Sequence, residues 1–320
     1  MNLWKLRLSM LGTLALIIGI TTMGFALVLS LINSLSLISL VILVASFNIL
    51  QWLIAPYMVN MLYRVRPLEA SESPRLHRIV QELSQRSGIR PPRLMLADIP
   101  VPNAFAYGSP LTGNNVAVTR GLLSSLEEEE VEAVIGHELG HLKHRDVQVM
   151  MFVSFLPSLF YLIARSMLYS GLYYDRRERR DTGGLAILGG ISMLIYFVLL
   201  LFTLSLSRLR EYYADQHSVS VVEDGARKLS EGLAKIVYST LRVRPYAGGS
   251  LAISGFKTLF ISDPDRASSD ALALQEARGG ASDSELVRSI LSRRVTWLDN
   301  LLELFSTHPN IVKRIRALQS

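Results

Sequence analysis

The chain contains no cysteine among its 320 residues. This absence excludes disulfides and thiolate metal ligands, so a metal could be held only by His, Asp and Glu side chains. The sequence also lacks a glycine-rich phosphate loop and a strip of interleaved aromatic and basic residues, which argues against nucleic acid as a partner. Hydrophobic residues are abundant instead, at 50% of the chain, and they come in long blocks.

The first two apolar blocks are residues 11–32 and 35–58, and neither contains a charged side chain. Each is long enough to cross a bilayer of about 30 Å as a helix, and the short gap between them predicts a membrane hairpin. A cleaved signal peptide is the alternative for the first block, but that block is too long and is followed at once by a second span. Basic residues flank the hairpin and place both its ends in the cytoplasm by the positive-inside rule. They are Lys5, Arg7, Arg64 and Arg66.

A second pair of apolar blocks, residues 147–169 and 184–206, predicts a second hairpin. Its connector, GLYYDRRERRDTGG, carries four arginines, although the first hairpin places this loop outside the cytoplasm. Acidic neighbours count little in the positive-inside rule, so the arginines still conflict with a position outside the cytoplasm. The third block also contains Pro157 and Arg165. The hairpin either spans the membrane or lies shallowly in it, and the length of both blocks favours spanning.

The polar segment between the hairpins predicts a mixed local structure. Ser73 followed by Pro74 is typical of a helix start, and Gly88 of its end. Short apolar runs separated by Gly, Pro and Asn then predict three strands of a small sheet. These runs are 93–98, 103–108 and 115–120. A capping box of Ser124 and Glu127 is expected to begin the next helix, whose four glutamates at 127–130 suit the positive end of the helix dipole.

After the second hairpin, the sequence predicts helices at 207–222 and 226–240, a mobile loop at 243–285, and a last helical stretch through ELVRSILSRRVTWLDNLLELF. The fold class expected is mainly α with a small β-sheet. Two membrane hairpins accompany a zincin-like protease domain assembled from two chain segments. The predicted divisions are 1–63 for the first hairpin, 64–146 for the first protease segment, 147–206 for the second hairpin and 207–320 for the second protease segment.

The stretch HELGHLKHRD at 137–146 carries the chemistry. His137 and His141 lie four residues apart, so a helix presents both imidazoles on one face, where they can bind one zinc ion. Glu138 then lies beside the metal, where it can act as a base toward water; this is the H-E-x-x-H pattern of zinc proteases. The bland alternative is a surface helix with two solvated histidines. His144 lies off the His137/His141 face and is predicted to be a surface residue.

A catalytic zinc needs a third protein ligand, and Glu211 in SRLREYYAD is the candidate. The histidine pair lies just before the third apolar block, and Glu211 lies just after the fourth. If these two blocks form a membrane hairpin, the histidines and Glu211 lie at the same membrane surface. Asp215, one turn further on, suits a carboxylate that holds a ligating histidine by its other N–H. The alternative for each is an ordinary solvated acid.

These motifs resemble the HtpX family of membrane zinc metalloproteases, which are relatives of the CaaX prenyl proteases. The similarity lies in HELGH with Asp146, SRLREYYAD after a hydrophobic hairpin, STHPNIVKRI and PNAFAYG. The resemblance implies zinc ligands His137, His141 and Glu211, a base at Glu138 and support from Asp215. It also implies that the strand near Asn103–Tyr107 (Asn103, Ala104, Phe105, Ala106 and Tyr107) lines the cleft and pairs with extended substrate.

The tetrahedral oxyanion of peptide hydrolysis needs a donor besides the metal. His308 in STHPN is the candidate, with Tyr107, Tyr212 and Tyr213 as weaker ones. A residue at a helix start before Pro309 is the alternative for His308. Arg314 either anchors the cleft or is a surface charge.

The sequence therefore predicts a multi-pass protein of a prokaryotic cytoplasmic membrane that holds one Zn²⁺ and hydrolyses peptide bonds at the cytoplasmic face. The expected partners are the lipid bilayer and protein substrates, chiefly membrane or misfolded proteins, in quality control. Two alternatives stay open. One is a processing protease for a single membrane-associated peptide, and the other is a zinc-binding scaffold without turnover.

Overall fold

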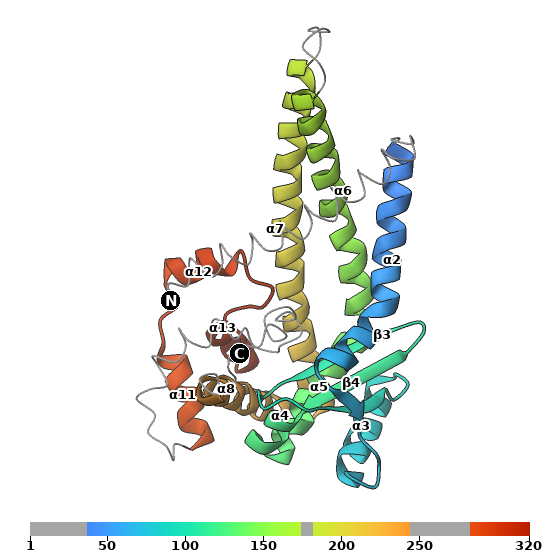
Figure 1. Ribbon diagram of the computed structural model, residues 1–320. Helices are drawn as coiled ribbons and strands as arrows, with labels where there is room; N and C mark the ends of the chain where they lie inside the picture. Colours follow the sequence, from blue (N-terminus) through green and yellow to red (C-terminus); the bar gives the residue numbers. More distant parts are fainter. Residues whose placement is uncertain (1–36, 174–181, 244–281) are drawn as a thin grey trace. The chain divides into compact units, whose positions relative to one another are not determined.

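The computed structural model describes residues 37–173, 182–243 and 282–320 (Figure 1). The predicted block 11–32, most of the arginine-rich connector and most of the 243–285 loop lie outside these residues. The described part is mainly helical with one small mixed sheet, as predicted. It divides into two compact units, each made of two chain segments. The first unit comprises the residues up to Trp52 and Val149–Thr203, and the second comprises Leu53–Gln148 and Leu204–Ser320.

Three described helices are long and apolar enough to cross a membrane by length and composition: α2 (Leu37–Leu62), α6 (Asp146–Tyr173) and α7 (Thr182–Val221). They confirm that the second, third and fourth apolar blocks are helical. Large apolar side chains of α2 and α7, such as Ile42, Leu194 and Phe202, are exposed. Apolar side chains facing outward along whole helices indicate a hydrocarbon surrounding rather than water. Spanning by the second hairpin stays a prediction.

The fourth apolar block and the segment that carries Glu211 form one uninterrupted helix, α7, drawn in yellow in Figure 1. Helix α7 runs through SRLREYYAD and ends at Val221. Gly225 follows and begins α8 (Gly225–Val243), which confirms the helix predicted at 226–240. Glu211 therefore follows the apolar block within the same helix.

The sheet has strand order β1-β2-β4-β3. Strands β2 and β4 are parallel, and the two outer pairs are antiparallel. The three predicted strands are confirmed, and the short β1 was missed because three residues carry no alternation. Gly113, the first residue of β4 after the turn from β3, has φ +70, which suits a residue without Cβ. The bounds are β1 Val65–Pro67, β2 Arg93–Ala97, β3 Ala104–Ser109 and β4 Gly113–Thr119.

Helix α3 (Pro74–Ser87) begins and ends as predicted, with Ser73 as N-cap and Gly88 in the left-handed conformation at φ 69. The cap predicted for the histidine helix was wrong. Ser124 belongs to the preceding α4 (Arg120–Ser125), where its hydroxyl donates to the Gly121 carbonyl. Helix α5 (Glu128–Lys143) is instead capped by Glu127 and Glu130, each side chain accepting from the backbone N–H of the other.

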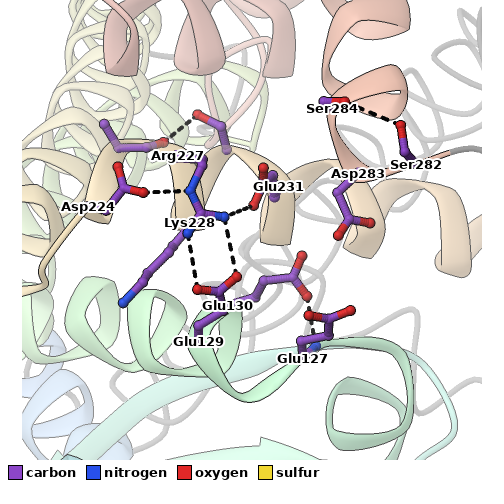
Figure 2. Close-up of polar contacts among 12 residues, drawn as sticks. Glu127, Glu129, Glu130, Asp224, Arg227, Lys228, Glu231, Ser282, Asp283 and Ser284 are labelled. Atoms are coloured by element: carbon purple, nitrogen blue, oxygen red, sulfur yellow. Dashed lines mark hydrogen bonds and ion pairs between the residues drawn. The ribbon is translucent and has the colours of Figure 1, made fainter.

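Helix α8 packs against α5 and supplies the cations for its acidic first turns. Arg227 pairs with Glu129 on α5 at 3.0 Å and also bonds Asp224 and Glu231 (Figure 2). Two lysines of α8 pair with further glutamates of α5. The glutamate run therefore serves the dipole of α5 and docks α8 onto it. Both helices face one hydrophobic core, to which α5 contributes Val131, Val134, Ile135 and Leu139 and α8 contributes Leu229, Leu233, Ile236 and Val237.

The last helical stretch of the sequence is broken in the structure. Helix α11 (Asp283–Ser292) is followed by Arg293, whose backbone is extended. Helix α12 (Trp297–Glu303) then begins with a new capping box of Thr296 and Asp299. The prediction of one stretch missed this cap, because the apolar spacing continues across it. Helix α13 (Ile311–Leu318) follows, with the Asn310 side chain accepting from the Val312 N–H.

Candidate metal centre

Helix α5 presents the predicted histidine pair on one buried face. The Nε2 atoms of His137 and His141 lie 3.1 Å apart. Gly136 and Gly140 allow this face to approach α7 closely, since a Cβ on Gly140 would lie 3.0 Å from the Ala214 Cα. The spacing of the glycines thus brings the histidine face of α5 against the helix that carries the predicted third ligand.

Glu211 of α7 reaches the same point. Its carboxylate oxygens lie 3.7 Å from the His137 Nε2 and 3.6 Å from the His141 Nε2. Tetrahedral coordination at about 2.0–2.1 Å places ligand atoms about 3.3 Å from one another, so these separations fit a single ion. Among the described residues, this group is one of two that could hold a metal.

The far side of each imidazole is held by a carboxylate. Asp215 Oδ1 lies 2.9 Å from the His137 Nδ1, and Asp146 Oδ2 lies 2.7 Å from the His141 Nδ1. If each Nδ1–H donates to its carboxylate, both Nε2 lone pairs face one another beside a third carboxylate. Such a set of converging acceptors suits a cation. The sequence predicts Asp215 in this position, whereas the role of Asp146, which belongs to the same motif as the histidines, is apparent only from the structure.

Arg314 lies beneath the group and is 1% exposed. Its Nε and Nη2 donate to both oxygens of Asp215, at 2.9 and 2.6 Å, and its Nη1 lies 3.1 Å from Glu211 Oε2. Burial would lower the pKa of the guanidinium, but the charges of Asp215 and Glu211 raise it above its usual range. The sequence left this residue open between an anchor of the cleft and a surface charge; its burial and its two carboxylate partners exclude the surface charge.

A second arginine supports the other histidine. Arg210 forms an ion pair with Asp146, and its Nη2 also donates to the His144 carbonyl at 2.8 Å. Arg210 precedes Glu211 on α7, and nothing in the spacing of the sequence indicated its partner. The His144 side chain is exposed, as predicted. Each histidine of the pair therefore has its own carboxylate, and each of those carboxylates has its own arginine.

The protonation of His141 follows from these neighbours. Burial alone would lower its pKa, but the hydrogen bond with Asp146 and the charges of Glu211 and Glu138 raise the pKa to about 9. Below that pH the metal-free imidazole carries a proton that a metal must displace.

Glu138 lies between the histidines and the edge of the sheet. It is buried, and its Oε2 accepts a hydrogen bond of 2.7 Å from the Ala106 N–H. Strand β3 pairs with β4 on one side alone within the sheet. Because N–H groups alternate along an antiparallel strand, those of Ala104 and Gly108 face the same edge as that of Ala106. We call it the free edge of β3 because no other strand among the described residues pairs with it. The structure thus brings the predicted base and the predicted substrate strand together.

In the predicted substrate strand, the side chains pack in the core, and the Ala106 backbone N–H faces Glu138. Asn103 is buried, and its N–H donates to the Thr119 hydroxyl. The rings of Phe105 and Tyr107 lie 5.5 Å apart in an aromatic cluster. The Tyr107 hydroxyl donates to Asn60 at 2.6 Å, so its proton is not directed at a substrate oxyanion.

His308 is buried beside Glu211, its Nδ1 lying 3.4 Å from the Glu211 Oε1. Its Nε2 is also buried and has no hydrogen-bond partner among the residues that the structure describes. The helix begins only at Ile311 with Asn310 as its cap, so His308 is not a capping residue. Of the other candidates, Tyr213 is 65% exposed on α7.

The second group of acids in the described chain is Glu130, Glu231 and Asp283. The Lys235 ammonium already neutralises two of these carboxylates, since its Nζ lies 2.8 Å from Glu130 and 3.0 Å from Asp283. Glu231 is paired with Arg227. This group is therefore a set of ion pairs between helices and not a metal centre.

The chain matches Peptidase family M48 over residues 70–320, a range that contains every residue of the site. The chain belongs to this family. The M48 protein is 35% identical to "Protease HtpX homolog" of Thermoplasma acidophilum, over 100% of this chain and 98% of that one. It is 37% identical to "Protease HtpX homolog 2" of Saccharolobus solfataricus, over 98% of this chain and 96% of that one.

Ste24p of S. mikatae has a similar fold, with a TM-score of 0.59 at 17% identity over 99% of this chain and 67% of that one. Membership of M48, the HtpX relatives and the three apolar helices identify a membrane metalloprotease. The family implies a divalent metal, and His137, His141 and Glu211 form a group able to hold it.

Proposed function

We propose that this M48 protein is a zinc-dependent endopeptidase that cleaves membrane or misfolded proteins at the cytoplasmic face of a multi-pass membrane anchor. The observation that carries the proposal is the convergence of His137, His141 and Glu211 on one point, with Glu138 between that point and the free edge of β3. Two nitrogens and one carboxylate are the donor set of a catalytic zinc, which keeps a further position open. The positive-inside rule supports the cytoplasmic placement, and the HtpX relatives support a role in quality control.

Each residue of the site has a distinct task in this proposal. A bound zinc ion supplies a Lewis acid that polarises the peptide carbonyl. Glu138 accepts the proton of the attacking water and passes it to the leaving amine. Asp215 and Asp146 hold the histidines in the tautomer that offers Nε2. The free edge of β3 pairs with extended substrate backbone, a mode of binding that accepts many sequences because main-chain groups supply the bonds.

Zinc reconstitution tests the proposal. The protein purified in detergent without zinc is expected to leave casein intact, and one equivalent of Zn²⁺ is expected to restore cleavage. Mg²⁺ should restore nothing, because it prefers oxygen ligands over imidazole. Zinc that binds without restoring cleavage would favour a scaffold or a protease dedicated to one substrate.

Zinc uptake is also expected to release a proton. With the pKa of His141 at about 9, the metal-free imidazole is protonated at pH 7.5, and zinc needs it neutral. The apparent zinc affinity should therefore rise about tenfold per pH unit and level off only near pH 9, not near the ordinary value of about 6.5. Calorimetry in buffers of different ionisation enthalpy measures the proton. Asp146→Asn, which removes the carboxylate partner, should lower the pH at which the affinity levels off.

His308 is proposed to donate from its Nε2 to the developing oxyanion. His308→Ala is expected to reduce kcat by about 10²–10³-fold, the usual effect of losing one such donor. The zinc content should stay at that of wild type, because His308 is not one of the three ligands. Turnover of a quenched fluorescent casein measures the effect. A rate near that of wild type would remove His308 from the mechanism.

A further inference from the structure

Helix α12 carries its apolar side chains outward and its acids inward. The exposed side chains are Trp297 75%, Leu298 48%, Leu301 39%, Leu304 45% and Phe305 40%. They lie at spacings of one, four, seven and eight residues from the first, which is the spacing of one stripe of a helix. Leu304 and Phe305 follow the last residue of α12 and continue the same spacing in the turn after it. Glu303, by contrast, is buried and pairs with Lys313. A helix on a water-facing surface shows the opposite arrangement.

The chain holds this stripe beside the end of a membrane helix. Arg208 Nη1 donates to the carbonyls of Glu303 and Ser306 at 2.8 and 2.9 Å, so it binds the C-terminal end of α12. Arg208 lies on α7, two residues beyond the apolar block 184–206. At about 1.5 Å per residue, that contact lies within one helical turn of the end of the apolar run.

The composition around the stripe matches a membrane–water interface. Tryptophan is enriched at that level because its ring is apolar and its N–H is polar. Arg294, three residues before Trp297, is exposed and can pair with lipid phosphates. Leu209, next to Arg208 on α7, is also exposed. A lipid surface uses both the apolar stripe and the exposed arginine beside it, whereas a protein partner would not need the arginine.

We propose that α12 and the turn after it form an interfacial membrane segment, and that the stripe of Trp297, Leu298, Leu301, Leu304 and Phe305 contacts lipid at the headgroup level. The contact gives the protein a second attachment besides its membrane helices. Because α13 and His308 follow α12 directly, the attachment also fixes the height of this side of the site above the bilayer. The inference rests on the membrane placement of the chain and not on the proposed catalysis.

Fluorescence of a single tryptophan tests the contact in the full-length protein. Trp4→Phe with Trp52→Phe leaves Trp297 as the sole tryptophan. The protein is reconstituted into phosphatidylcholine vesicles whose acyl chains carry bromine close to the headgroup. Trp297 emission is expected to be quenched by the brominated lipid and protected from acrylamide in the water. A variant that keeps only Trp52, within the candidate span Val41–Leu62, is the positive control.

Leu123→Trp in a tryptophan-free background is the matched negative control, because Leu123 is a similarly exposed leucine on α4. It should be quenched by acrylamide and not by brominated lipid. Leu301→Glu in the Trp297-only protein should lose the lipid quenching, while unchanged zinc binding shows that the fold is intact. Quenching of Trp297 by acrylamide alone would overturn the proposal. Protection from both quenchers would also overturn it, since another protein segment or a second copy would then cover the stripe.

Discussion

Glu138→Gln is expected to reduce casein cleavage by about 10²–10⁴-fold, the usual contribution of a general base. The amide cannot accept the proton of water, but it keeps an oxygen that can accept from the Ala106 N–H, as the carboxylate now does at 2.7 Å. The fold and the edge of β3 should therefore stay in place. Initial rates at saturating zinc measure the effect.

Two controls separate loss of the base from loss of the metal. Zinc content should be unchanged in Glu138→Gln, because the carboxylate is not one of the three converging ligands. Glu132→Gln on the same helix is the matched variant, since Glu132 pairs with Lys228 at 3.1 Å on the side facing α8. It should cleave like wild type. Undiminished cleavage by Glu138→Gln would contradict the mechanism, whereas inactivity of the wild type as well would favour a scaffold or a dedicated processing enzyme.

Sequence spacing was sufficient for the three converging residues. The four-residue interval fixes both histidines on one helical face, and the predicted second hairpin leads us to expect Glu211 on the same side of the membrane as the histidines. The sheet followed from short apolar runs between turn residues. These features are local, or depend on one connection of known length.

The supporting residues of the site could not be predicted in the same way. Arg314 is separated from Asp215 by 99 residues, and their contact depends on how α13 packs. Arg210 and Asp146 are 64 residues apart, and their contact depends on how α7 packs beside the start of α6. The outward stripe of α12 was hidden because apolar spacing alone does not tell which face is buried.

Arg314→Met is expected to destabilise the metal-free protein by about 3–5 kcal/mol, the usual result of breaking a buried ion pair on one side. Methionine has a similar volume but leaves Asp215 and Glu211 buried as two neighbouring anions. Bound zinc compensates part of that charge, so the loss should be smaller in the zinc form. Thermal unfolding in detergent, with and without zinc, measures both. Arg316→Met, on the exposed side of the same helix, is the control. It loses two exposed hydrogen bonds to the carbonyls of Leu291 and Arg293 but leaves no buried charge unpaired, so it should cost only about 0.5–1.5 kcal/mol, with or without zinc.

A double-mutant cycle decides whether the loss comes from the unpaired carboxylate. Asp215→Asn removes one anion, so adding it to Arg314→Met should cost less than the sum of the two single changes. The two hydrogen bonds of 2.9 and 2.6 Å between these side chains predict a coupling of about 0.5–3 kcal/mol. Strict additivity would mean that the two groups do not interact, and the arginine would then act only by filling space. Coupling that weakens when zinc is bound would show that the arginine and the metal neutralise the same pair of carboxylates.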